Sequence, residues 1–170
     1  IVYIFSTTST LAEAMGTRMY FPEDDAPQVE NPFIQTREDL KKLKPVEPEK
    51  DGRLPVYLEA VKRCVDTIGN EVFVVPVIGA PFTTSAALRG TETFIKELYT
   101  DPELVHAVMK VATQSVKNLI DAYVKAGSVP VTVEPVATGS MISEKHFREF
   151  VLPYLKEVYA HIHSFSLPGV

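Results

Sequence analysis

The hydrophobic pattern changes its period along the chain and so separates strands from helices. Residues 72–78 are apolar with almost no interruption, which is typical of a strand covered on both faces. Shorter apolar runs at 1–5 and 129–134 predict two further strands. Apolar residues spaced by three or four predict a helix over 54–68, which ends at Gly69. Strands separated by helical segments predict an α/β fold with a parallel sheet.

Two long helices carry clear start and stop signals. Asp101-Pro102-Glu103 combines an N-cap acid, a proline in the first turn and a further acid, and the helix closes before Gly127. Ser143 is the expected N-cap of another helix, and Pro153 inside it predicts a kink.

Capping-box spacing predicts two shorter helices, one beginning at Thr10 with Glu13 and one at Thr36 with Asp39. Residues 22–35 between them are polar and rich in turn formers. We expect this segment to be an excursion over the edge or mouth of the fold.

Composition narrows the classes of function. The 170 residues include 22 acidic and 17 basic side chains, with a formal charge of −5 and no clustered basic patch, so a nucleic-acid partner is not expected. No apolar run approaches the roughly 18 residues needed to cross a membrane, so no membrane partner is expected either. Cys64 is the only cysteine, which excludes an intrachain disulfide and fits a cytoplasmic location.

Candidate chemistry gathers where the strands end, because ligands of parallel α/β folds bind at the carboxyl ends of the strands. Glu134 is the acid at one such end and is predicted to be catalytic, as a substrate-contacting or supporting carboxylate; the alternative is a solvated acid at the rim. The hydroxyls of Ser6 and Thr7 either hold a ligand such as a phosphate or form the local hydrogen bonds of a turn. Phe82 either walls a flat cofactor pocket or is a core aromatic. Thr83 is expected to be a helix cap.

Other polar residues have plainer interpretations. His161 and His163 lie two apart on a predicted helix, so their side chains point in nearly opposite directions and share no metal. His106 and His146 are expected at the surface or as capping residues. Arg89 is expected to be a helix-end cation, with a carboxylate anchor as the alternative. No metal ligand is assigned in the chain.

The ordered motifs resemble one family. Gly79-Ala80-Pro81-Phe82-Thr83 followed by Leu98-Tyr99-Thr100-Asp101-Pro102-Glu103 is similar to the uroporphyrinogen decarboxylase family. The resemblance implies a (β/α)8 TIM barrel with the active site at the carboxyl ends of its strands. Three strands cannot close such a barrel, which needs about 250 residues. We therefore expect residues 1–170 to form a single incomplete barrel domain, truncated at both ends.

The resemblance separates two branches of the family. Decarboxylases have an Asp where this chain has Thr7, a Tyr at the position of Ala87, and a Ser in the turn that here reads Glu134-Pro135-Val136. The run from Glu134 to Ser143 instead resembles the corrinoid-linked methyltransferases. That branch implies methyl transfer from a methyl-corrinoid to a thiol, with zinc and a corrinoid (methylcobalamin) as cofactors and zinc ligands beyond Val170.

The function predicted from the sequence is thus a corrinoid-dependent methyltransferase acting on a zinc-activated thiol. The alternatives are uroporphyrinogen decarboxylase of tetrapyrrole (heme) biosynthesis and a non-catalytic barrel that binds a corrinoid protein. Partners are expected to be a small molecule or a corrinoid protein, with a homodimer possible. The residues predicted to bind substrate are Ser6, Thr7, Gly79, Pro81, Phe82, Thr138 and Ser140. For Ser6 and Thr7, the resemblance adds a corrinoid side chain to the ligands that their hydroxyls would hold.

Overall fold

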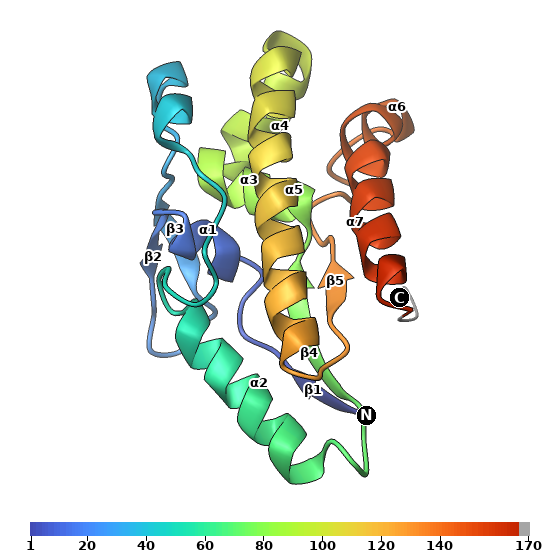
Figure 1. Cartoon of the computed structure of the whole chain (residues 1–170). Coiled ribbons are helices and arrows are strands. Elements are labelled where there is room, and N and C mark those ends of the chain that lie inside the picture. The colour runs from blue at the N-terminus through green and yellow to red at the C-terminus, as the bar shows by residue number, and fades with distance from the viewer. Residues whose placement is uncertain (167–170) are drawn as a thin grey trace.

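A three-stranded parallel sheet forms the centre of the molecule (Figure 1). The computed structural model describes residues 1–166. The sheet order is β1 (Val2–Ile4), β4 (Val74–Gly79) and β5 (Val131–Val133). Because the strands are parallel and Gly79 pairs with Val133, their carboxyl ends lie at one edge of the sheet. The predicted α/β class is confirmed, and so is the existence of the three predicted strands.

Two long helices follow the predicted patterns closely. α2 spans Leu54–Ile68, and α5 spans Pro102–Lys125. The Asp101 side chain accepts a hydrogen bond from the backbone N–H of Leu104, as expected of an N-cap. Gly127 follows α5 with φ 84°, the left-handed conformation that suits glycine after a helix. None of the helices within residues 1–166 is both long and apolar enough to cross a membrane.

Helices also connect the strand ends. α3 (Pro81–Arg89) starts directly after β4 and is followed by α4 (Thr91–Thr100). After β5, Ser143 caps α6 (Glu144–His146) by accepting from the His146 N–H, as predicted. The predicted disturbance at Pro153 takes the form of a π-helical turn, residues 147–151, before α7 (Leu152–Ser164), because proline cannot donate a backbone hydrogen bond.

The region before α2 contains one element that the pattern did not predict. β2 (Arg18–Tyr20) pairs antiparallel with β3 (Gln28–Asn31), and β3 lies inside the segment expected to be an irregular excursion. α1 (Thr10–Ala14) exists, but its predicted capping box is wrong. Thr10 is the first helical residue rather than the cap, and its hydroxyl donates to the Thr7 carbonyl. The next capping box, at the start of the 3₁₀ helix η1 (Arg37–Lys42), is confirmed.

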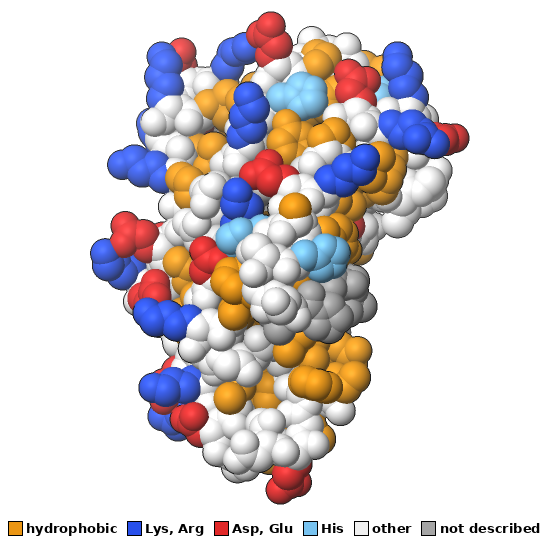
Figure 2. Space-filling model, turned by 45° about the vertical axis from the view of Figure 1, so that its right-hand side comes forward, with side chains coloured by type: hydrophobic (Ala, Val, Ile, Leu, Met, Phe, Trp, Pro, Cys, Tyr) orange, Lys and Arg blue, Asp and Glu red, His pale blue; other side chains and the backbone are white. Residues whose placement is uncertain are grey.

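The sheet is buried mainly on the face that carries its even-numbered residues. Side chains alternate between the two faces of a strand, and Val74 and Ile78 belong to the main hydrophobic core. On the other face Tyr3 is 64% exposed, and the neighbouring Phe5 and Phe73 are exposed as well. Figure 2 shows hydrophobic side chains gathered at the lower right of the molecule, on the side of the N terminus.

Candidate active site

The turn from β4 into α3 is built around Gly79. A Cβ atom at this position would lie 2.1 Å from the Thr8 carbonyl oxygen, a distance that no side chain tolerates. Glycine therefore lets the loop after β1 close onto the end of β4. The Ala80 N–H donates to the Val133 carbonyl at 2.8 Å, which ties the same turn to β5. The three strand ends thus meet at one place.

Glu134 follows β5 and reaches across to the N terminus of α3. Its Oε2 accepts from the Phe82 N–H at 3.0 Å, and its Oε1 accepts from the Thr83 N–H at 2.5 Å and from the Thr83 hydroxyl. The N-cap residue of α3, Ala80, offers no side-chain cap of its own. Because helix N termini present unpaired N–H groups and partial positive charge, Glu134 serves as a cap supplied by another strand.

Burial governs the acidity of Glu134. It raises the pKa of this carboxyl from 4.5 to about 7, while the hydrogen bonds from Thr83 and Phe82 act in the opposite direction. Among residues 1–166, no charged side chain contributes to this pKa shift. A carboxyl group that exchanges its proton near neutral pH is suited to acid–base chemistry, so the structure is compatible with the predicted catalytic role and does not test it.

The hydroxyls of the loop after β1 are engaged locally. Ser6 Oγ lies 2.8 Å from Thr10 Oγ1, and Thr7 Oγ1 accepts from the Ser9 N–H at 3.2 Å. Turn chemistry, one of the two interpretations of these residues, therefore accounts for both hydroxyls. Their binding of a ligand stays a prediction.

The remaining predicted binding residues divide between core and surface. Pro81 and Phe82 are buried, and the Phe82 ring packs edge-on against Phe94 with centroids 5.1 Å apart. Phe82 is thus a core aromatic, and only its backbone N–H turns to Glu134. Thr138 and Ser140 lie on the exposed loop after β5, with their hydroxyl oxygens 2.9 Å apart.

Thr83 is the functional side chain whose role the sequence did not reveal. The sequence predicts that it caps α3, whereas in the structure its hydroxyl donates to Glu134 and accepts from the Val136 N–H at 3.3 Å. The available signal was its place two residues after Pro81, where a first-turn side chain faces the strand ends. Its partners could not be read from the sequence.

Two other side chains lie differently from expectation. His146 is buried, with 7% exposure, rather than at the surface, and its ring packs edge-on against Tyr99. Arg89 pairs with Glu97 and donates to two backbone carbonyls of the β3–η1 segment, because its guanidinium presents several donors. Arg89 therefore links the β3–η1 segment to α3 by hydrogen bonds. Its predicted role as a helix-end cation does not include this contact.

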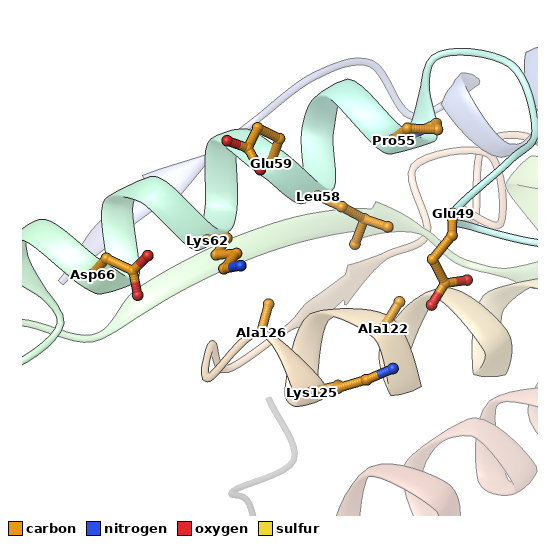
Figure 3. Close-up of a pocket in the computed structure, with 9 residues that line it drawn as sticks. All are labelled: Glu49, Pro55, Leu58, Glu59, Lys62, Asp66, Ala122, Lys125 and Ala126. Atoms are coloured by element: carbon orange, nitrogen blue, oxygen red, sulfur yellow. The ribbon is translucent and has the colours of Figure 1, made fainter.

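A separate groove of about 540 Å³ lies between α2 and the C-terminal end of α5 (Figure 3). It is near the amino ends of the strands, because α5 leads there into β5. Acids and lysines mix along it, including Glu59, Lys62 and Lys125. None of the predicted site residues lines this groove. Across residues 1–166, no three His, Cys, Asp or Glu side chains come together as metal ligands.

Comparison with known proteins identifies the family. The family model described as uroporphyrinogen decarboxylase (URO-D) matches residues 1–168. The chain belongs to the uroporphyrinogen decarboxylase family. The resemblance drawn from the Gly79–Thr83 and Leu98–Glu103 motifs is thereby confirmed.

Relatives from both the decarboxylase and the methyltransferase branch of the family match this chain. The uroporphyrinogen decarboxylase of Aromatoleum aromaticum is 30% identical over 163 residues, which are 92% of this chain and 45% of that protein. The methylated-thiol–coenzyme M methyltransferase of Methanosarcina mazei is 32% identical over 145 residues, 84% of this chain and 38% of that protein. Both relatives are enzymes. The chain spans less than half the length of each of these two curated relatives.

A solved structure supports the fold. A methyltransferase from Methanosarcina mazei superposes with a TM-score of 0.86 and 26% identity, over 95% of this chain and 48% of that one. The parallel sheet and its helices are therefore part of a TIM barrel of the URO-D type, as predicted.

Proposed function

We propose that the chain belongs to an enzyme that transfers a methyl group from a corrinoid to a thiol. One observation carries the proposal. Glu134 is the acid at the three described strand ends, and its carboxyl is bound to the N terminus of α3. Thr7, which stands where the decarboxylase pattern has an Asp, offers a hydroxyl that already bonds to the Ser9 N–H. These ends therefore present no free carboxylate for the pyrrole N–H groups of a tetrapyrrole.

The same arrangement suits a thiolate nucleophile. A thiolate is repelled by a nearby free anion, and the carboxyl of Glu134 is partly neutral near pH 7 and satisfied by three donors. The methylated-thiol–coenzyme M methyltransferase among the relatives supports this branch, at an identity similar to that of the decarboxylase. Ala87 supports it as well, because it is buried in α3 where the decarboxylase pattern has a tyrosine.

Zinc would supply the activation of the thiol by lowering its pKa. The described residues do not fit a zinc site. Cys64 lies on α2, away from the strand ends, and no ligand cluster includes it. We therefore assign no zinc ligand within residues 1–166 and derive no step through zinc or corrinoid. A corrinoid-protein partner, a homodimer and a cytoplasmic location stay predictions from the sequence.

The test is a methylcobalamin demethylation assay on protein expressed from the complete gene. The protein is loaded with zinc and given coenzyme M or another small thiol, and the visible spectrum is followed. Loss of the methyl–cobalt absorbance that depends on both thiol and protein supports the proposal. No loss with several thiols, together with carbon dioxide release from uroporphyrinogen, would establish the decarboxylase alternative.

A further inference from the structure

We propose that Thr83 and Glu134 form a clamp that holds the β4–α3 turn and the β5–α6 loop in one arrangement, and that Glu134 is a positioning residue of the site. We call this pair the Thr83–Glu134 clamp. Its effect on turnover rests on the proposed methyl transfer, whereas its existence can be tested without any activity.

The clamp joins two loops through one hydroxyl. Thr83 donates its hydroxyl hydrogen to Glu134 Oε1 and accepts the Val136 N–H on the same oxygen. The backbone N–H groups of Phe82 and Thr83 bind the same carboxyl. The first turn of α3 and the first residues after β5 are thus connected by four hydrogen bonds that meet at two side chains.

Most of the hydrogen-bond acceptor capacity of Glu134 is used within the clamp. Oε1 accepts two of the hydrogen bonds and Oε2 accepts the third. Thr83 is only 3% exposed, so water competes poorly for its hydroxyl. The described groups that contact the carboxyl, Phe82 and Thr83, are uncharged, and burial accordingly raises the pKa of Glu134. A group satisfied in this way acts through the backbone that it holds.

The clamp controls the loop that carries predicted binding residues. Val136 is its attachment point, and the neighbouring Ala137 packs against the core. Beyond this anchor, Thr138 and Ser140 are exposed on the loop. Release of the Val136 N–H would therefore let these hydroxyls move relative to the end of β4.

Amide exchange tests the clamp directly. In Thr83→Val, which keeps the shape but removes the hydroxyl, exchange of the Val136 amide should rise about tenfold or more relative to core amides of α5, and Thr83→Ser should restore it. Thr84→Val is the matched control, because Thr84 lies in the same turn but donates to the Gly79 carbonyl instead. An unchanged relative rate at Val136 in Thr83→Val would overturn the proposal.

A double-mutant comparison tests the positioning role. If Glu134 acts through the clamp, Thr83→Val and Glu134→Gln should each lower kcat about tenfold, and the double variant should lose no more than either alone. Thr83→Ser should keep most of the activity. Activity abolished by Glu134→Gln but untouched by Thr83→Val would refute positioning and assign Glu134 a direct catalytic role. Wild-type protein that leaves methylcobalamin unchanged would count against the proposed function, and amide exchange would still decide the clamp.

Discussion

Two carboxylates in this molecule bind helix N termini through the same kinds of donor, namely two backbone N–H groups and one threonine hydroxyl. Asp39 accepts from the N–H groups of Gln35 and Thr36 and from the Thr36 hydroxyl. Glu134 accepts from two consecutive N–H groups and a threonine hydroxyl of α3. Their pKa values nevertheless shift in opposite directions.

Solvent and a neighbouring cation explain the difference. Lys42 donates to Asp39 and lowers its pKa most, and the Thr36 hydrogen bonds lower it further. Glu134 has equivalent hydrogen bonds but no cation beside it in the part of the chain that the structure describes, and burial raises its pKa to about 7. Hydrogen bonds from a helix N terminus therefore do not by themselves fix the charge of a carboxyl group; a neighbouring cation and burial of the carboxyl shift its pKa as well.

Truncation of Glu134 should have the largest effect on stability of the changes considered for the two capping carboxylates, Glu134 and Asp39. Glu134→Ala leaves the Phe82 and Thr83 N–H groups without their acceptor in a buried place. We expect a loss of about 2 kcal/mol in the free energy of unfolding at pH 6, measured by urea denaturation. Glu134→Gln, which keeps one acceptor oxygen, is the control and should lose clearly less. Equal losses would mean that the acceptor is not what stabilises α3.

The pH dependence should separate the two carboxyls by sign. The folded state holds the proton of Glu134 more tightly than the unfolded state, so its contribution to the free energy of unfolding falls by roughly 2–3 kcal/mol as pH rises from about 4.5 to 7. Asp39, whose pKa is lowered, loses its contribution only as pH falls below its ordinary value of 3.8.

Urea unfolding across pH 4.5–8 measures this difference, with Glu134→Gln as the variant that should remove the decline. A decline of the same size in the variant would assign it to other groups.

Truncation of Asp39 should matter less than truncation of Glu134. Asp39→Ala removes a local cap of η1, but water can replace the carboxylate as acceptor for the exposed N–H groups. For Asp39→Ala we expect roughly half the shift in urea midpoint seen for Glu134→Ala. The size of this shift should be the same at every pH between 5 and 8. A larger shift than that of Glu134→Ala would reverse the ranking by burial.

The smallest effect is expected from Lys42→Ala. It removes an exposed ion pair three residues apart on η1, so the urea midpoint should stay almost unchanged. The pKa of Asp39 should nevertheless rise toward its ordinary value, because Lys42 is the main cause of its lowering. An NMR titration of the Asp39 carboxyl measures this, and Lys41→Ala, which pairs with Glu38 instead, is the control.

Elements with a strong local pattern could be predicted from the sequence. The spacing of apolar residues placed α2, and Asp101, Pro102 and Gly127 placed the ends of α5. β3 was missed because its four residues are mostly exposed and gain their structure by pairing with β2. His146 was misplaced because its burial depends on Tyr99 and Phe150, which come from other helical segments.

In the candidate site too, some features follow from the local sequence and others depend on contacts between distant segments. The strand ends and Glu134 could be located from the sequence, because an apolar run followed by a glycine or an acid marks where a parallel strand stops. The sequence leaves the core position of Phe82 open, since its contact with Phe94 is made between two helices. The role of Thr83 depends on loops that only the folded sheet brings together.

By itself the sequence determined the α/β class, the family motifs and the cap at Asp39, whose partners lie three and four residues away. Only the tertiary structure decided that Glu134 caps a helix 52 positions earlier in the chain. A local cap follows from the spacing of residues along the backbone. A cap between distant segments requires the register of β4 and β5, and it takes its proton affinity from the burial that this register creates.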